Sequence, residues 1–209
     1  MADWQTISSL ATAGGTLVLA VATFSAVRSA NRSARIAEES LLTGMRPLLL
    51  PSLGDAPPQK VIWVDRHAVR VEGGRVHVEL ADGVVYLAIS LRNVGPGIAL
   101  LHGWHPMPAL TRDHHADPSD FRRLSVDLYV AGGGVGYWQG AIREPDDPLR
   151  APLLAAMRDR EPFAVDLLYG DQAGAQRIVS RFSVLPSGDD GWYSQAARHW
   201  DLDRPAPRS

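Results

Sequence analysis

The sequence predicts a mainly β protein, an antiparallel immunoglobulin-like β-sandwich preceded by one long N-terminal α-helix. Residues 4–27 carry no charge, and an uncharged helical run of that length suits a lipid bilayer. After Pro47 apolar and polar residues alternate, with Gly-rich turn signals between the runs, which is typical of short antiparallel strands. We therefore expect a transmembrane and stalk helix at 1–46, a β-sandwich at 47–186 and a Trp- and Pro-rich tail at 187–209.

Composition and charge limit the classes of function. The chain has 209 residues, with 21 basic and 23 acidic side chains. Four Arg and three acidic residues lie in 1–46, so the body carries a net negative charge. Nucleic acid requires a basic face, and we therefore expect no nucleic-acid partner. The absence of Cys excludes disulfides, thiolate nucleophiles and Cys-ligated zinc. We expect no cofactor.

The uncharged run at 4–27 is long enough to cross a bilayer. As a helix it extends about 36 Å, against a hydrocarbon core of about 30 Å. Its apolar side chains together contribute only about −2 to −5 kcal/mol to insertion, because Ser, Thr and Gly interrupt them. A cleaved signal peptide, with "AVA" at 20–22 as a cleavage site, and a buried soluble helix are the alternatives. We favour the span, because no basic residue precedes the run and it has no strong polar face.

Flanking charges predict the orientation of the span. Arg28, Arg32 and Arg35 follow it closely, and Arg46 lies further along. The positive-inside rule then gives a single-pass protein of the plasma membrane, with its N-terminus outside and its β-domain cytoplasmic. We expect these arginines to set the topology, and a specific contact with anionic lipid is the less favoured alternative.

Small residues recur at four-residue spacing within the span. Such rows let two spanning helices pack closely, which would support a homo-oligomer. The two rows are Ser8, Thr12, Thr16 and Ala20, and Ala11 with Gly15.

Alternating runs predict ten strands in the body. They lie at 48–53, 60–65, 68–72, 75–80, 84–93, 97–102, 124–131, 135–139, 163–170 and 176–184. Turn signals lie between several of them, at 72–75, 81–83, 132–134 and 171–174. We expect a short helix within 146–162 that crosses between the two sheets, and another near 193–199 in the tail.

Three segments carry a resemblance to a known family. The family is that of uncharacterised actinobacterial single-span membrane proteins. Its Asn-x-Gly-x-Gly-x-Ala motif resembles "LRNVGPGIAL" (91–100), and its Tyr-x-Asp-x-x-Gly hairpin resembles "LLYGDQAGAQRIVSRF" (167–182). Its C-terminal tail is similar to "RHWDLDRPAPR" (198–208). The resemblance covers most of the chain and implies location and fold, but no activity.

The same motifs have a physical interpretation as structural turns. Asn93 and Gly95 tolerate a positive φ, and Gly97 allows another backbone segment to approach closely. Asp171 can cap its own turn, which Gly174 completes. We expect all five residues to act in folding rather than in chemistry.

The segment 102–120 gathers side chains that could bind a metal. Imidazole and carboxylate groups are ligands for zinc and similar ions. The spacing matches no recognised site, however, and two histidines three positions apart in an extended segment face opposite ways. A solvated loop is the favoured alternative. The weak candidates are His102, His105, Asp113, His114, His115 and Asp117.

No motif for catalysis stands out elsewhere. The glycine-rich stretch 131–140 lacks the Lys-Ser/Thr of a phosphate-binding loop, and no Gly-x-Ser-x-Gly elbow is present. Aromatic residues could line a groove for a partner, although packing in the core explains most of them as well. They are Trp63, Trp104, Trp138, Trp192, Tyr193 and Trp200.

The sequence therefore favours a membrane-anchored, non-enzymatic interaction or scaffold module. Its partners would be the bilayer, through residues 4–27, and an unknown protein that contacts a sheet edge or the tail aromatics. One alternative is a metal-dependent hydrolase or metal sensor that uses the loop 102–117. Another is an extracytoplasmic ligand-binding domain, which follows if the topology is inverted.

Overall fold

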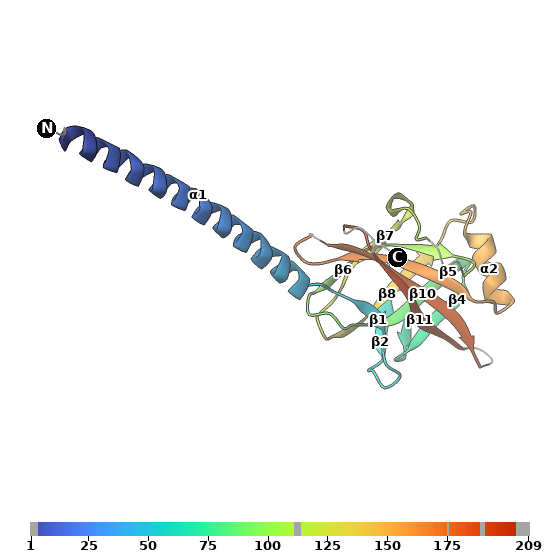
Figure 1. The fold of residues 1–209 in the computed structure, drawn as a ribbon. Coiled ribbons are helices and arrows are strands. Elements are labelled where there is room, and N and C mark those ends of the chain that lie inside the picture. Colours follow the sequence, from blue (N-terminus) through green and yellow to red (C-terminus); the bar gives the residue numbers. More distant parts are fainter. Residues whose placement is uncertain (1–3, 111–113, 175, 189–190, 204–209) are drawn as a thin grey trace. The chain divides into compact units, whose positions relative to one another are not determined.

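The computed structural model describes residues 4–110, 114–174, 176–188 and 191–203. Contacts between residues divide the chain into two units, one ending at Gly44 and the other beginning at Met45. The first is a single helix and the second is a body of antiparallel strands (Figure 1). The predicted fold class, mainly β with one N-terminal helix, is confirmed.

Helix α1 runs without interruption from Trp4 to Gly44. Within it, Ala13–Glu38 is long and apolar enough to cross a membrane, and none of its side chains is buried in the structure. The hydroxyls of Thr23 and Ser25 donate to backbone carbonyls one turn earlier, at 2.8 Å each. Such bonds satisfy polar side chains inside a helix, and they lower the cost of placing Thr and Ser in lipid.

Only part of the predicted small-residue face can be described. Gly15, Thr16 and Ala20 are exposed on α1. The side chains of Ser8, Ala11 and Thr12 lie outside the described part of the chain.

All ten predicted strands are present, several with shifted ends, and an eleventh follows them. The strands are β1 (Leu49–Pro51), β2 (Gln59–Ile62), β3 (Ala68–Val71), β4 (Arg75–Ala81), β5 (Val84–Asn93), β6 (Ala99–Met107), β7 (Arg122–Val130), β8 (Val135–Ile142), β9 (Phe163–Gly170), β10 (Arg177–Ser187) and β11 (Gly191–Asp201). The helix expected within 146–162 is α2 (Arg150–Arg158), and a 3-10 turn, η1 (Pro118–Asp120), precedes β7.

Nine of the eleven strands form one long antiparallel sheet that folds around a core. Its order is β1-β5-β4-β11-β10-β9-β6-β7, and β8 pairs with β5. Between β4 and β11 only two residue pairs join the sheet, at Val76–Trp192 and Arg75–Tyr193. The rings of Trp104 in β6 and Trp138 in β8 meet edge to face at 5.2 Å, although these two strands are not paired. The two halves of the sheet therefore face each other as the layers of a sandwich.

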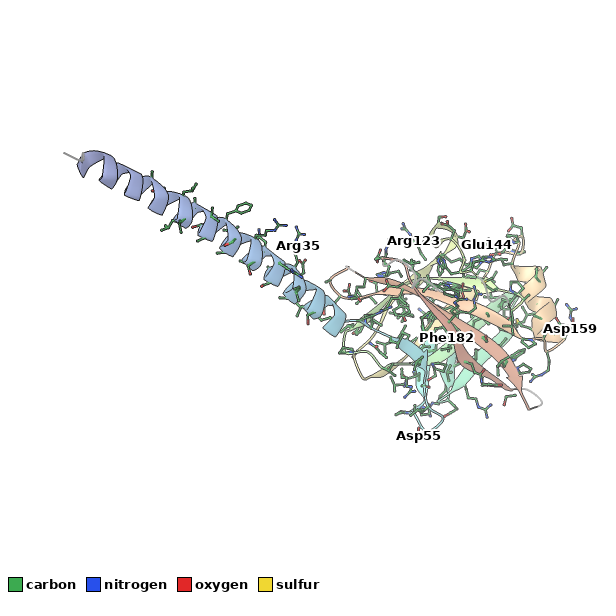
Figure 2. The ribbon with its side chains drawn as sticks, viewed as in Figure 1. Arg35, Asp55, Arg123, Glu144, Asp159 and Phe182 are labelled. Atoms are coloured by element: carbon green, nitrogen blue, oxygen red, sulfur yellow. The ribbon has the colours of Figure 1, made fainter. Side chains whose placement is uncertain are left out.

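Strand β5 is buried on both faces. Leu87 and Ile89 point into the main core, which also holds Phe182 of β10 (Figure 2). Tyr86 and Ala88 alternate with them and point outward. A separate hairpin of β2 and β3 covers this outer face and forms a second small core with it.

The prediction of a helix near 193–199 is wrong. Residues 191–201 form β11, which pairs with β10 along nearly its whole length. Trp192 and Ser194 are buried on one face of β11, and the Trp192 ring packs on Phe163 at 5.5 Å. Burial of Trp192 and the free edge of β10 outweigh the local helix preference of "QAAR" at 195–198.

Asn93 ties three segments of backbone together. Its Oδ1 accepts from the N–H groups of Leu48 and Gly95, each at 3.0 Å. Its Nδ2 donates to the carbonyl oxygens of Gly97 and Val130, at 2.6 and 3.1 Å. All four hydrogen-bonding positions of the amide are used, and Asn93 is 1% exposed.

The glycines of this motif allow close approach rather than a positive φ. Neither Asn93 nor Gly95 has a positive φ, so the fold does not use the tolerance expected of them. A Cβ on Gly97 would overlap the carbonyl oxygen of Met45, and one on Gly95 would overlap that of Arg46. The close approach predicted for Gly97 is confirmed.

The turn at 171–174 forms largely as expected. Gly174 has φ +70° and donates its N–H to the carbonyl of Asp171 at 3.2 Å. The side chain of Asp171 accepts from the N–H of Gln176 across the turn, at 3.3 Å. Asp171 thus caps the hairpin between β9 and β10.

We expect Asn93→Asp to lower the free energy of unfolding by at least about 2 kcal/mol. The substitution keeps the shape but replaces the donating Nδ2 with an oxygen that would face two carbonyl oxygens. Chemical denaturation of the full chain in detergent measures the effect, and Gln195→Glu on the exposed side of β11 is the matched control. Equal losses in the two variants would show that the buried amide has no special role.

Candidate functional site

His105, His114, His115 and Asp117 of the predicted metal loop have separate structural partners. His102 is exposed on β6, and His105 Nδ1 lies 3.2 Å from the carbonyl oxygen of Asp120. Asp117 caps η1, where its Oδ1 accepts from the N–H of Ser119 at 2.9 Å and from its hydroxyl at 2.6 Å. These bonds lower the pKa of Asp117.

His114 and His115, the other two histidines of the loop, also make structural contacts. The carbonyl oxygen of His114 accepts from Arg181, and the ring of His115 packs edge to face on Trp200 at 5.4 Å. Asp113 lies outside the described residues. In the described part of 102–117, the ligand atoms do not form a group that could hold a metal ion.

A different group of ligand atoms does converge. Nε2 of His67 and Nε2 of His77 lie 2.9 and 3.0 Å from the same oxygen, Oε2 of Glu79. The three atoms all lie within 4.8 Å of one another. The side chains are 24%, 23% and 39% exposed, so solvent reaches the group. We call His67, His77 and Glu79 the His-His-Glu cluster.

Strand β4 supplies two members of the cluster. His77 and Glu79 are two residues apart on β4, and they therefore point to the same, outer face. Across the ladder on β5, Ala88 is the partner of His77 and Tyr86 is the partner of Glu79. The small side chain of Ala88 leaves room above β5 for the imidazole of His77.

The connection between β2 and β3 supplies the third member. The N–H of Trp63 donates to the carbonyl of His67, and the N–H of Arg66 to that of Trp63, each at 2.9 Å. The N–H of His67 donates to Oδ1 of Asp65 at 3.1 Å. Arg66 has φ +68°, which completes the tight turn. This turn holds His67 over the outer face of β4.

Aromatic packing fixes the His67 ring. It stacks on Tyr86 with centroids 4.1 Å apart and planes 17° apart. The centroid of the Trp63 ring lies 5.5 Å from that of His67 and 6.1 Å from that of His77. The indole N–H of Trp63 donates to the carbonyl of Gly140 at 3.1 Å. The imidazole of His67 therefore has a defined position next to Glu79.

Polar contacts extend from the cluster to Arg143, the residue that follows β8. The hydroxyl of Tyr86 donates to Oδ2 of Asp65 at 2.7 Å, and Arg143 pairs with the same oxygen at 2.8 Å. Burial alone would raise the pKa of Asp65, but these hydrogen bonds outweigh it and lower the pKa to about 2. Burial and the bond to Asp65 raise the pKa of Tyr86 to about 12. At neutral pH Asp65 is ionised and Tyr86 is the donor.

His77 is held toward its neutral form. Burial lowers the pKa of His77, and Glu79 opposes that shift. A neutral imidazole is the form that coordinates metals, and two imidazoles with one carboxylate form a ligand set found in zinc sites. The cluster therefore has the chemistry of a three-ligand metal site with room for solvent.

The sequence carries one signal for this cluster, although the predicted metal ligands lie elsewhere in the chain. His77 and Glu79 stand two apart in "RVHVEL" at 75–80, a run predicted as a strand. Alternation places them on one face, which is a usable clue to a shared site. No sequence pattern links them to His67, because that contact depends on how the hairpin of β2 and β3 folds back.

Most of the aromatic residues that could have lined a groove for a partner are buried in the interior. Trp63, Trp104, Trp138 and Trp192 are all buried, whereas Tyr193 and Trp200 are partly exposed. Trp200 lines a surface hollow of about 480 Å³ together with Arg181, Arg198 and Leu110. The guanidinium groups of both arginines lie over the Trp200 ring, at 5.0 and 5.5 Å.

A serine and a histidine lie together between β10 and β11. Oγ of Ser180 is 2.5 Å from Nδ1 of His199 and 2.8 Å from the hydroxyl of Tyr169. That hydroxyl in turn accepts from the N–H of Leu49. Ser180 is fully buried, so its hydroxyl is out of reach of a substrate. The chain of bonds joins β1, β9, β10 and β11.

Comparison of the chain with models of known protein families, with curated proteins and with solved structures returned no match.

Proposed function

We propose that this protein is a single-pass, membrane-anchored interaction or scaffold module with no enzymatic activity, whose β-domain lies on the cytoplasmic face of the plasma membrane. The observation that carries the proposal is the helix α1. Its segment Ala13–Glu38 has the length and composition of a span, and its large apolar side chains, such as Leu17 and Phe24, are exposed. A soluble protein rarely leaves such a surface uncovered.

Arginines at the end of this segment support the orientation. Arg28, Arg32 and Arg35 follow the apolar part of α1, and the side chain of Arg35 projects from the helix (Figure 2). Positions 28, 32 and 35 share one face of a helix, where they can meet anionic headgroups on the cytoplasmic side. Residues 1–3 carry no basic side chain.

The surface of the β-domain supports an interaction role. Strand β7 is the last strand of the sheet, and its Tyr129 is 72% exposed. Exposed strand edges can pair with another chain, and exposed Tyr is common at protein interfaces. The immunoglobulin-like character of the β-domain and the resemblance to actinobacterial single-span proteins are part of this proposal, and both concern its fold and location.

Cysteine labelling tests the orientation. The chain has no Cys, so single substitutions at Ala2 and at the exposed Asp55 and Asp159 give probes without background. In intact cells we expect a membrane-impermeant maleimide to label Ala2→Cys only. Permeabilised cells should label all three.

Labelling of Asp55→Cys and Asp159→Cys in intact cells would instead place the β-domain outside and favour a ligand-binding role there. Recovery of the chain in the soluble fraction would refute the anchor itself. A triple variant, Arg28→Ala with Arg32→Ala and Arg35→Ala, should show mixed labelling, because it removes the charges that we hold responsible for orientation.

A further inference from the structure

We propose that the His-His-Glu cluster binds one divalent transition-metal ion, with Zn²⁺ as the best fit, and that the ion fastens the hairpin of β2 and β3 to the outer face of β4. The site is separate from the loop 102–117 and independent of the membrane anchor.

The geometry of the three ligand atoms carries the proposal. In a tetrahedral zinc site with bonds of about 2.1 Å, ligand atoms lie about 3.4 Å apart. The two imidazole nitrogens lie 2.9 and 3.0 Å from Oε2 of Glu79, and all three atoms fall within 4.8 Å. Small rotations of the side chains are enough to place an ion among them. When an ion binds, the proton of each neutral imidazole moves from Nε2 to Nδ1, and Nε2 coordinates the ion.

The surroundings favour a fixed site over a chance contact. His67 is held by its stack on Tyr86, by Trp63 and by the turn that Asp65 closes. His77 and Glu79 are held in register on β4 by pairing with β5. A site on strands and a rigid turn loses little freedom when it binds an ion, which favours affinity.

The donor set selects the class of ion. Two imidazole nitrogens and one carboxylate suit zinc and its neighbours in the first transition row. Calcium and magnesium prefer sites made of oxygen atoms alone. Three protein ligands leave at least one position for water, and the partial exposure of all three side chains gives solvent access to it.

The position of the cluster explains what an ion would do for the fold. The hairpin of β2 and β3 forms its own two-stranded sheet and contacts the rest of the body through side chains such as Trp63 and Val61. An ion shared by His67 and His77 adds a bond between the turn of this hairpin and β4. Binding to the folded state alone then raises the melting temperature.

Metal titration of the full chain in detergent tests the proposal. The protein is purified without a His tag, treated with a chelator and titrated with Co²⁺ and Zn²⁺. We expect one ion per chain, visible ligand-field bands for Co²⁺ and a higher melting temperature with Zn²⁺. His77→Gln and Glu79→Gln should each weaken binding more than about 100-fold, because each removes a direct ligand.

The matched control changes all four described loop histidines, at positions 102, 105, 114 and 115, to Ala and should bind like the parent chain. Circular dichroism without metal identifies any variant that has not folded, and two separate single substitutions keep the test decisive. The proposal is overturned if the parent chain binds neither ion, if both variants bind as tightly as the parent, or if the loop variant is the one that loses binding. None of these results bears on membrane anchorage.

Discussion

Replacing Arg181 with Met is expected to lower the free energy of unfolding by about 3 to 5 kcal/mol. Arg181 and Asp166 are direct neighbours on β10 and β9, and they are 2% and 0% exposed. Nε and Nη2 of the guanidinium each donate to one carboxylate oxygen at 2.7 Å. In the variant the carboxylate stays buried without the cation that compensates its charge, which is the costly case for a buried ion pair.

The same substitution at Arg177 is the matched control. Arg177 lies on the same strand and pairs with Asp203 at 2.7 Å, but its side chain is 56% exposed. An exposed pair contributes about 0 to 1 kcal/mol, so Arg177→Met should unfold almost like the parent. Thermal and chemical denaturation measure both variants, and a loss of 3 to 5 kcal/mol corresponds to roughly 6 to 20 °C in Tm for a chain of this size.

A double variant separates charge from packing. Arg181→Met with Asp166→Leu removes both charges and keeps apolar volume at this site, which lies on the face of β9 and β10 opposite the main core, next to Met107 and His114. The double variant should therefore recover most of the stability that the single variant loses. If the double variant is as unstable as Arg181→Met, then Arg181 stabilises the fold mainly through its contacts with the carbonyl of His114 and with Met107. The ion-pair explanation would then fail.

The strands could be predicted from the sequence because each carries its own evidence. In 84–93 the alternation and the flanking Asp82-Gly83 turn define β5, and both turn residues have the positive φ that such a hairpin requires. Strand β11 lacked that evidence. Its residues 195–198 have a local helix preference, and only the edge of β10 and the pocket for Trp192 make them extended.

The candidate site could not be predicted in the same way. Alternation shows which side chains share a face of β4, but not which other segment covers that face. Six potential ligands close together in 102–117 gave the stronger signal, yet the extended backbone of β6 separates His102 from His105. His67 reaches Glu79 through a fold of the hairpin that no local pattern records.

We expect the double variant Leu17→Arg with Val21→Arg to leave the membrane fraction. Both positions are exposed on α1, and they lie in the middle part of the uncharged run 4–27. An arginine near the centre of a span costs about 2.5 to 3.5 kcal/mol, and two of them outweigh the roughly −2 to −5 kcal/mol that the apolar side chains of the span contribute. Alkaline carbonate extraction followed by sedimentation measures the fraction that remains inserted, and circular dichroism of the soluble product should still show the β-domain.

The control, Leu17→Ala with Val21→Ala, removes the same two apolar side chains without adding charge. Its loss of about 0.6 to 1.2 kcal/mol is small against the total, so most of this variant should stay in the membrane fraction. The comparison is informative because the span is only marginally apolar, and a stronger span would tolerate two arginines. If the Arg variant stays fully inserted, or if the parent chain is extracted by carbonate, α1 does not hold this protein by crossing the bilayer.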